Sequence, residues 1–521
     1  MEASAKLPVV VPKGVGGMDN DDVAAAGGKK QAAAGRWGFV QFFFVLAVVF
    51  CVLLYAPRVL VLSPYGYSID VGLFAPTPTA SSVPQRVAGG NAAALDNQVR
   101  SPCSSMRDHT ICCDRSSVHT DVCFMAGDVR TDAASLSLLL FPPHQQAQNG
   151  TSEEDKEERV RPYPRKWERF IMDKVPEVRL RVAAPRRPDG EREEVEHRCD
   201  VRHDAPLLVM SAGGYTGNLF HAFNDGFLPS WLTVQHLRRR VVLGVVSYNP
   251  WWAGMFVEVI SGLSDHPVVD LLHDTRTHCF PGAIVGTRYH GILIVDPARL
   301  RDNKTIVDFH QMLADAYEKP PRETTRPAQQ QDLRDAEQRR RPRLGIVSRK
   351  GTRVIENQAA VARLASSVGF DVDILETANG LPLSAWYASL RACDALVGVH
   401  GADLTKFLFL RPGRASLTQI APLGVSPIAR EDFGEPAARM GLAYEQYEVR
   451  AGESSLARRY APGDAVLTDP EAAKRDKGGW DLVARVYLGG QNVTLDLARF
   501  RQTLARMHAH AMRQRRRQER L

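Results

Sequence analysis

The clearest pattern in the chain is an alternation of short apolar runs with amphipathic segments over residues 344–420. Two segments with helical spacing of apolar residues, 356–368 and 383–392, separate the first runs. Four runs have the length and composition of buried strands: 344–347, 370–375, 395–399 and 416–420. Strands and helices that alternate at this spacing form right-handed βαβ units. We therefore expect a parallel sheet whose ligands bind beyond the carboxyl ends of the strands.

The most informative junction in this region is the turn at His400-Gly401. An apolar run stops there and continues as a short helical pattern over residues 404–410. A strand, a turn and a helix in this order direct the first helical N–H groups at the turn, which suits a phosphate-bearing ligand. Arg349 follows the first strand of the region, so it should lie near His400, where its planar guanidinium could hold two phosphate oxygens.

A second pattern of this kind lies in the preceding half of the chain. A buried strand and a glycine turn lead to a helix that we expect Thr216 to cap. Asn218, His221 and Asp225 recur on one face of this helix. Such a face beside a double glycine is what a general-base site requires, although a solvated polar stripe would show the same pattern. Asp225 or His221 is the candidate base, and their four-residue spacing lets one orient the other.

Two further residues of this half are candidates for the acceptor side of the site. Asn224 is adjacent to Asp225, and Arg288 follows an apolar run that has the character of a strand. We expect both, together with Asn218, to support acceptor binding.

The longest apolar run, residues 37–55, contains no charged residue and is long enough to cross a bilayer. Basic residues shortly before it outnumber those just after it, which places residues 1–36 in the cytoplasm. A cleaved signal peptide is the alternative. Residues 56–100 are rich in Pro, Ser, Thr and Ala, which predicts a disordered stem. We expect a single-pass type II membrane protein with its bulk on the lumenal side.

The lumenal part divides into two α/β halves. A charged stretch with paired prolines and a triple glutamine, residues 319–342, predicts a linker between them. The N-terminal domain, 101–318, would carry the acceptor site and the base. The C-terminal domain, 343–521, would bind the phosphate-bearing ligand and end in a basic tail.

Composition changes this picture little. Of 521 residues 44% are hydrophobic and 24% charged, which is ordinary for globular domains, and the net charge is +7. Part of the positive excess is an arginine cluster in residues 513–520. It lacks interleaved aromatic residues and a recognisable nucleic-acid module, so we interpret it as a solvated tail and exclude nucleic-acid binding.

Seven of the eight cysteines follow the apolar run, where an oxidising lumen permits disulfides. An odd number leaves at least one thiol unpaired within the chain, and Cys393, in an apolar context, is predicted to be a buried free thiol. Cys112, Cys113 and Cys123 lack the Cys-x-x-Cys pairs of structural zinc sites, so no metal is expected there. Three glycosylation sequons also follow the run, at Asn149, Asn303 and Asn492.

Several ordered motifs carry a family resemblance. They include His221-Ala-Phe-Asn-Asp-Gly226, the His-Gly-Ala turn at His400, and segments 113–123, 127–130, 162–166, 213–218, 279–282, 348–349 and 478–481. With these motifs the chain resembles plant members of glycosyltransferase family 61, especially the grass-expanded branch of xylan arabinosyl- and xylosyltransferases.

The resemblance implies a Golgi enzyme with a GT-B-like α/β fold, in which two Rossmann-type domains face a cleft. It implies inverting transfer of a pentose from a UDP-sugar to xylan, without a prosthetic group or an essential metal, and possible partners in a xylan synthase complex. Asp371-Val-Asp373 spells a metal-binding motif but lies in a predicted strand, so we interpret it as a chance match. An N-acetylglucosamine- or N-glycan-directed activity of the same family and a non-catalytic Golgi polysaccharide-binding scaffold are the alternatives.

The chain departs from the wider family at the His400 turn. The family often reads His-Gly-Ala-Gly-Leu-Thr-Asn there, whereas this chain has Asp403 and Lys406 in place of the glycine and the asparagine. Asp403 either stabilises the helix N-terminus or alters the choice of donor. We assign donor binding to Arg349, His400, Gly401, Asp403 and Lys406. His119 also stands where an arginine is expected.

Overall fold

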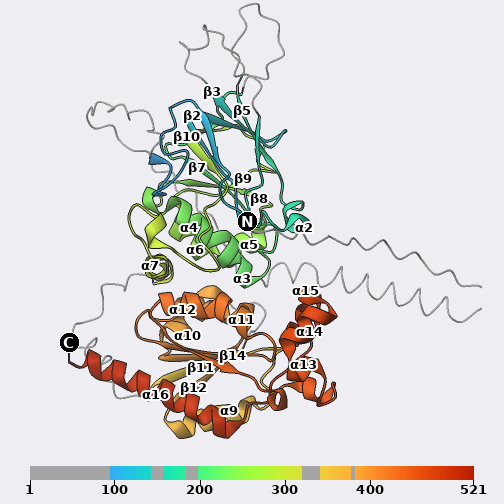
Figure 1. Cartoon of the computed structure of the whole chain (residues 1–521). Helices are drawn as coiled ribbons and strands as arrows, with labels where there is room; N and C mark the ends of the chain where they lie inside the picture. The colour runs from blue at the N-terminus through green and yellow to red at the C-terminus, as the bar shows by residue number, and fades with distance from the viewer. Residues whose placement is uncertain (1–93, 142–156, 184–196, 319–340, 377–381, 521) are drawn as a thin grey trace, which may run out of the picture. The chain divides into compact units, whose positions relative to one another are not determined.

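The computed structural model describes residues 94–141, 157–183, 197–318, 341–376 and 382–520. The predicted membrane segment, nearly all of the stem, most of the linker and the sequon at Asn149 lie outside these residues. Within them, no helix is both long enough and apolar enough to cross a membrane. The described chain contains two β-sheets flanked by helices, which confirms the α/β class (Figure 1).

The C-terminal sheet has five parallel strands, and the predicted alternation is confirmed there. The strands, in spatial order, are β12 (Asp371–Glu376), β11 (Arg343–Ser348), β13 (Ala395–Val399), β14 (Ser416–Ala421) and β15 (Ala443–Glu448). The direction in which the chain adds strands reverses between β11 and β13. In open α/β sheets, ligands bind at the carboxyl ends of strands at such a switch point.

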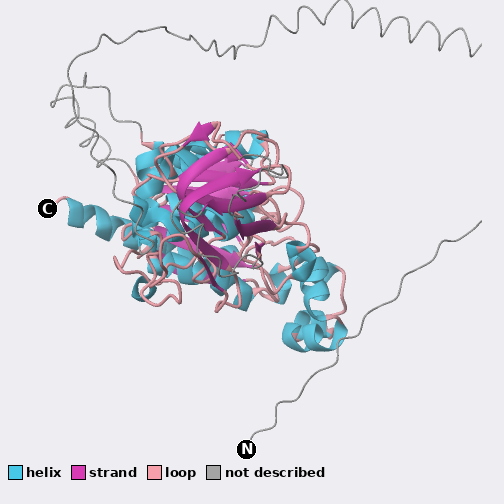
Figure 2. Cartoon of the chain, turned by 90° about the horizontal axis from the view of Figure 1, so that it is seen from above, coloured by secondary structure: helices cyan, strands magenta, loops and turns pink. Residues whose placement is uncertain are grey.

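Helices cover both faces of this sheet (Figure 1). One face packs against α9 (Gln358–Val368) and α16 (Leu497–Gln518). The other carries α10 (Leu383–Arg391), α11 (Ser426–Ala429) and α12 (Glu435–Arg439). The strands are therefore shielded on both sides. Figure 2 shows the described chain from above, with helices around its strands. This shielding explains why the strands read as continuous apolar runs.

The N-terminal sheet differs from the Rossmann-type domain that we expected, because it is mixed. Its order is β4-β5-β3-β2-β10-β7-β8-β9, with β1 beside β2 and β6 beside β10. Strands β10, β7, β8 and β9 are parallel, whereas β2 runs antiparallel to both β10 and β3. The strand bounds are β1 (Ile111–Asp114), β2 (Val122–Asp132), β3 (Ser137–Phe141), β4 (Glu158–Val160), β5 (Val178–Val182), β6 (Val201–Arg202), β7 (Leu207–Ser211), β8 (Val242–Val246), β9 (Val269–Asp270) and β10 (His278–Val285).

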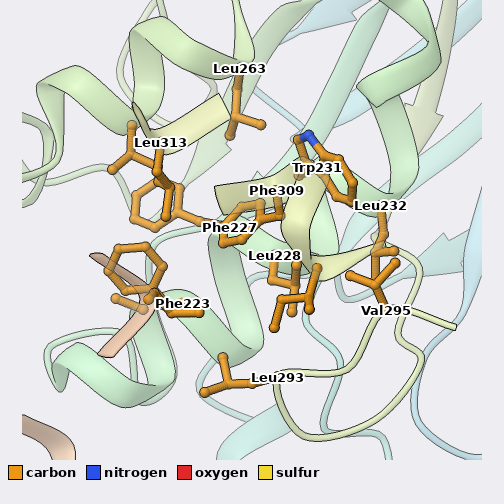
Figure 3. Close-up of a cluster of buried hydrophobic side chains, with 14 of the residues drawn as sticks. Phe223, Phe227, Leu228, Trp231, Leu232, Leu263, Leu293, Val295, Phe309 and Leu313 are labelled. Atoms are coloured by element: carbon orange, nitrogen blue, oxygen red, sulfur yellow. The ribbon is translucent and has the colours of Figure 1, made fainter. Parts of the chain in front are cut away.

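Helices of the N-terminal half bury a cluster of large side chains, which Figure 3 shows in close-up. Phe223 and Phe227 come from the π-helix η2 (Ala222–Phe227), and Trp231 comes from α4 (Leu228–Val234). Phe309 comes from α7 (Ile306–Tyr317). The other α-helices described in this half are α2 (Arg169–Met172), α3 (Leu219–His221), α5 (Pro250–Met255) and α6 (Val257–Leu263).

The same hydrophobic cluster continues into the C-terminal half. Phe223 makes an edge-to-face contact with Phe409 of the 3-10 helix η5 (Ala402–Phe409), with 6.4 Å between ring centroids. The imidazole Nδ1 of His310 lies 2.7 Å from the carbonyl oxygen of Leu408. The two halves thus share a core beside η5, and this core holds α3 next to the end of β13.

The cysteines form three disulfides in the described chain: Cys103–Cys112, Cys113–Cys123 and Cys199–Cys279. The prediction of a buried free thiol at Cys393 is confirmed. Burial raises the pKa of this thiol to about 12, so it stays protonated and inert.

Two regions near the ends of the predicted domains contribute to the fold. The folded part begins before residue 101, because Asp96 is buried and pairs with Arg288 at 2.7 Å. The basic tail is mostly helix, since α16 extends to Gln518 and Arg515 pairs with Asp394 at 2.6 Å. The physical reason is an apolar stripe along α16 that buries Phe500, Leu504, Met507 and Ala511.

Three other sequence features have clear positions. Asp373 lies inside β12 and pairs with Arg343 at 2.6 Å, as expected for a chance motif within a strand. Asn303 is exposed. Asn492 is half-buried, and its side-chain oxygen accepts a hydrogen bond from the backbone N–H of Val354.

Candidate active site

The helix that carries the candidate base begins differently from the prediction. Asn218 is its N-cap and accepts a hydrogen bond from the N–H of Phe220 at 2.9 Å. Thr216 instead donates to the carbonyl of Gly213 at 2.7 Å. Asn218 therefore has a capping role, because its side-chain oxygen satisfies a free N–H of the first turn.

After one turn the helix widens into the π-helix η2, which contains Asp225. The N–H of Leu228 bonds to the carbonyl of Phe223, five residues earlier, which makes the turn π-helical. The next residue, Pro229, has no N–H to give to the carbonyl of Asp225. Short π-helical turns are rare and often mark functional sites. Here the wider turn carries Asp225, whose side chain is fully buried.

His221 and Asp225 form a hydrogen-bonded pair. Nδ1 of His221 lies 2.7 Å from Oδ2 of Asp225. The side chain of His221 is 21% exposed, whereas that of Asp225 is 0% exposed. Within the part of the chain that the structure describes, Nε2 of His221 forms no hydrogen bond. His221 thus offers a free ring nitrogen, and Asp225 fixes the orientation of the ring.

Other buried groups saturate the carboxylate of Asp225. Tyr163 donates its hydroxyl at 2.8 Å, Arg165 donates through two nitrogens at 3.1 Å, and Asn224 donates at 2.6 Å. Burial alone would raise the pKa of Asp225, but the hydrogen bond with His221 and the charge of Arg165 outweigh it and lower this pKa. Asp225 is therefore ionised, enclosed and unable to reach an acceptor.

Tyr215 completes the surroundings of His221. The two rings stack with 4.6 Å between centroids, and the Tyr215 hydroxyl donates to Glu168 at 3.1 Å. Glu168 in turn pairs with Arg165 at 2.6 Å. Sequence reasoning assigned no role to Tyr163 or Arg165, although both belong to the 162–166 motif that supported the family resemblance.

Of the two residues predicted to support acceptor binding, Asn224 contacts Asp225 and Arg288 pairs with other carboxylates. Asn224 is buried, donates to Asp225 and accepts from the N–H of Leu293 at 2.8 Å, so it ties η2 to a neighbouring loop. Arg288 is also buried, but it pairs with Asp114 at 2.5 Å and with Asp96 at 2.7 Å. No contact joins Arg288 to His221 among the described residues, and its two terminal guanidinium nitrogens are held by these two carboxylates.

The C-terminal cluster lies at the switch point of the parallel sheet. Arg349 follows β11 and His400 follows β13, as predicted. Gly401 has φ of +151°, and a Cβ atom there would lie 2.8 Å from the guanidinium of Arg349. Glycine therefore lets Arg349 approach the turn. Arg353, which sequence reasoning missed, donates to the carbonyl of His400 at 3.1 Å.

Asp403 and Lys406, the two departures from the wider family, contact each other. Nζ of Lys406 lies 3.2 Å from one oxygen of Asp403, and Nη1 of Arg349 lies 3.0 Å from the other. Lys406 also sits over the ring of Trp386 at 3.7 Å. Burial lowers the pKa of Lys406 despite the nearby carboxylate. Asp403 thus bridges two of the cations assigned to donor binding, within a 3-10 helix instead of the expected α-helix.

His400 is buried and neutral. Burial, followed by the charges of Arg353 and Arg349, lowers its pKa to about 3. The side-chain nitrogen of Gln419 lies 2.9 Å from Nδ1 of His400, while Tyr444 donates to the oxygen of Gln419 at 2.8 Å. Because the Gln419 amide donates to Nδ1, the ring proton sits on Nε2.

Nε2 of His400 lies 3.8 Å from Asp432, a residue of the π-helix η6 (Arg430–Gly434) that sequence reasoning missed. Burial, with a smaller contribution from Glu431, raises the pKa of Asp432 to about 7. A carboxyl group with this pKa can change its charge near neutral pH.

Two phenylalanines connect the His221 pair with the His400 turn. Phe220 contacts Phe433 with 5.5 Å between centroids, and Phe433 contacts His400 at the same distance. Among the described residues, no group of three or more His, Cys, Asp or Glu side chains is placed to hold a metal ion. The arrangement thus pairs a proton acceptor with a cationic turn suited to a phosphate group.

The chain matches one protein family and several known proteins. Residues 219–417, which include His221, Asp225 and the His400 turn, match the family described as Glycosyltransferase 61. The chain is 37% identical over 422 residues to the Xylan glycosyltransferase MUCI21 of Arabidopsis thaliana, covering 80% of this chain and 83% of the relative. It is 33% identical over 403 residues to the Beta-1,2-xylosyltransferase XYXT1 of Oryza sativa subsp. japonica, covering 75% of this chain and 82% of the relative.

A third similar protein is the Alpha-1,3-arabinosyltransferase XAT3 of Oryza sativa subsp. japonica. The identity is 32% over 393 residues, which cover 75% of this chain and 64% of the relative. The extent of the match to MUCI21 exceeds what a shared motif or a single shared domain would produce. The chain therefore belongs to glycosyltransferase family 61.

Proposed function

We propose that this glycosyltransferase moves a pentose, xylose or arabinose, from a UDP-sugar to a xylan-type polysaccharide with inversion at the anomeric carbon. The observation that carries the proposal is the hydrogen-bonded His221–Asp225 pair, separated from the cationic turn at His400 by only Phe220 and Phe433. The relatives support the sugar and the acceptor, since they are described as a xylan glycosyltransferase, a xylosyltransferase and an arabinosyltransferase.

In this mechanism His221 is the general base. Its free Nε2 takes the proton of the acceptor hydroxyl while the hydroxyl oxygen bonds to the anomeric carbon. Asp225 accepts the Nδ1–H hydrogen bond and stabilises the imidazolium that forms, as the third member of a triad does. Tyr163 and Arg165 hold Asp225 in place. This choice between His221 and Asp225 rests on the enclosure of Asp225.

The other half of the reaction is departure of the UDP diphosphate. The bond between the anomeric carbon and the phosphate oxygen breaks as the new bond forms on the opposite face. Arg349, Arg353 and Lys406 supply positive charge around the turn, and neutral His400 offers an Nε2–H donor. We propose that these groups stabilise the diphosphate without an essential metal.

The proposal includes the architecture and the location of the enzyme. The mixed N-terminal sheet and the parallel C-terminal sheet would act as the acceptor and donor halves of a GT-B-like enzyme. The apolar run 37–55 would anchor it as a type II protein in the Golgi membrane. Protease protection of an epitope in the C-terminal half in sealed Golgi vesicles tests this location.

One experiment tests the activity. The purified full-length chain is incubated with each of three donors, UDP-xylose, UDP-arabinofuranose and UDP-N-acetylglucosamine, against xylo-oligosaccharides and an N-glycan. Transfer of a pentose to xylo-oligosaccharides is the expected result, and EDTA should leave it intact. Transfer only to the N-glycan would show that the acceptor is not xylan. Transfer only of N-acetylglucosamine would show that the donor sugar is not a pentose. Neither transfer nor UDP release with any donor would favour a non-catalytic polysaccharide-binding protein.

A further inference from the structure

A half-exposed tryptophan borders the candidate active site. Trp167 is 50% exposed, and tryptophan is enriched at binding surfaces, where its ring offers a large apolar face to a ligand. Its edge packs against the ring of His119, with 4.7 Å between centroids and an interplanar angle of 85°. His119 also contacts Tyr289 at 5.0 Å. The exposed ring is therefore braced from behind by two further rings.

The loops that carry Trp167 and His119 are fastened together. The N–H of Lys166 donates to the carbonyl of His119 at 3.0 Å. The Lys166 ammonium pairs with Asp121 at 2.7 Å, and Arg115 pairs with the same carboxylate at 2.7 Å. Trp167 is thus presented on a braced loop, which reduces the entropy that a ligand must remove on binding.

Trp167 is also connected to the candidate base. The guanidinium carbon of Arg165 lies 5.5 Å from the ring centroid of Trp167 and 5.6 Å from that of Tyr215. Tyr215 stacks on His221 at 4.6 Å. The imidazole of His221, the ring of Tyr215, the guanidinium of Arg165 and the ring of Trp167 therefore contact one another in this order.

The chemistry of this row fits a carbohydrate chain. An aromatic ring has a negative face and a positive edge, and the C–H groups on one face of a pyranose are weakly positive. A flat, neutral sugar can therefore stack on Trp167. The guanidinium of Arg165 contacts the Trp167 ring and also lies 3.1 Å from Nδ1 of His221. Trp167 is therefore one side chain away from the base, and the stacked unit would not be the one whose hydroxyl reacts.

We propose that Trp167, braced by His119, forms an acceptor subsite that binds a pyranose unit of the polysaccharide beyond the unit that receives the new sugar. This inference rests on the proposed function. It adds that the enzyme recognises an extended chain, so acceptor affinity should increase with chain length.

The test compares Trp167→Leu with Trp167→Phe in the full-length chain. Leucine keeps an apolar side chain without an aromatic face, whereas phenylalanine keeps the face. We measure KM for xylo-oligosaccharides of increasing length, KM for the donor, and UDP release without acceptor. Trp167→Leu should raise KM for long acceptors roughly three- to tenfold and leave the shortest active acceptor, the donor KM and UDP release unchanged. Trp167→Phe should stay close to the wild type.

An unchanged length dependence of KM in Trp167→Leu would overturn the inference, and so would equal KM increases for all acceptors. Retardation of the chain in a xylan-containing native gel provides a readout that does not need activity. If the wild type transfers no sugar but is retarded by xylan, and Trp167→Leu is not retarded, the proposed function fails and the subsite remains. If transfer occurs and neither KM nor retardation responds to Trp167→Leu, the subsite fails and the function remains.

Discussion

Nδ1 of His221 lies 2.7 Å from the carboxylate of Asp225, and only the histidine of this pair reaches the surface. The spacing of the two residues in the sequence permits either to act as the base. The side chain of Asp225 is 0% exposed and already accepts hydrogen bonds from Tyr163, Arg165 and Asn224. An acceptor hydroxyl can therefore reach His221 but not Asp225. Substitutions should show that His221 reacts with the acceptor and that Asp225 positions His221.

Replacing His221 with alanine should lower the rate of sugar transfer by about 10²- to 10⁴-fold, because the general base is lost. The thermal midpoint should fall only modestly, since the ring is 21% exposed and Asp225 keeps Tyr163, Arg165 and Asn224 as partners. The measurement is kcat with a xylo-oligosaccharide acceptor, together with thermal unfolding. His273→Ala is the matched control, because His273 also pairs with an aspartate, Asp270, at 2.8 Å but is exposed elsewhere. A kcat within tenfold of the wild type for His221→Ala would exclude this base.

Replacing Asp225 with asparagine should reduce both activity and stability. Arg165 would lose its buried partner and keep Glu168, so the free energy of unfolding should fall by about 1.5–3 kcal/mol. Because the native pKa of Asp225 is lowered, its stabilisation is present above the ordinary carboxyl pKa and is lost as the pH falls through the lower native value. Chemical denaturation of both forms at several pH values tests this. The difference between them should shrink toward strongly acidic pH, and a constant difference would contradict it.

Asp403 and Lys406 should be energetically coupled in binding UDP. Asp403→Asn removes a negative charge beside Arg349, so UDP should bind more tightly by about 1 kcal/mol, roughly fivefold. Lys406→Ala removes a positive charge and should weaken binding. The double variant Asp403→Asn with Lys406→Ala leaves the net charge of the turn unaltered. Because the two side chains contact each other, Asp403→Asn should change the inhibition constant for UDP by a different factor in the Lys406→Ala background than in the wild type.

Inhibition constants for UDP in a double-mutant cycle measure this coupling, which is about 0.5–3 kcal/mol for residues in contact. Asp373→Asn is the control, because Asp373 pairs with Arg343 in the same sheet and belongs to the chance Asp-x-Asp motif. It should leave the inhibition constant unchanged. If the changes in UDP binding free energy at 403 and 406 simply add, the ion pair between these residues does not affect UDP binding.

Asp432→Asn should stabilise the protein at neutral and alkaline pH. The native pKa of Asp432 is raised to about 7, so the unfolded state ionises first as the pH rises from about 4. Ionisation of Asp432 thus removes stability between these values and has no effect below them. The gain in Asp432→Asn has an upper limit of about 4 kcal/mol, which solvent reduces because the side chain is 19% exposed. The test measures the unfolding free energies of Asp432→Asn and of the wild type at pH 4 and pH 8. The two proteins should be equally stable at pH 4, and Asp432→Asn should be more stable at pH 8.

Arg288 should prove structural instead of ligand-binding. Arg288→Ala leaves Asp96 and Asp114 buried without a counter-charge, which costs about 3–5 kcal/mol. The variant that remains folded at low temperature should keep the donor and acceptor KM values of the wild type. Thermal unfolding and steady-state kinetics at 10 °C measure the two effects. A large rise in acceptor KM without a loss of stability would return Arg288 to the acceptor site.

The amino-acid sequence alone determined the local part of this protein. Apolar runs of strand length alternate with amphipathic helices after residue 344, and this period is enough to specify a parallel sheet with Arg349 and His400 at neighbouring strand ends. The i, i+4 spacing of His221 and Asp225 likewise follows from helix geometry. Such features depend on residues close together in the chain, where periodicity is informative.

Tertiary structure decided what depends on distant residues. Arg165 and Tyr163 reach Asp225 from about 60 positions away, and no periodicity connects them. Arg288 pairs with Asp96 and Asp114, which are more than 170 positions away in the chain. The antiparallel β2 made the N-terminal sheet mixed, since strand pairing across long separations has no local signal. The roles of His221 as the exposed member of its pair and of Asp403 as a bridge were set by burial and charge pairing, which exist only once the chain is folded.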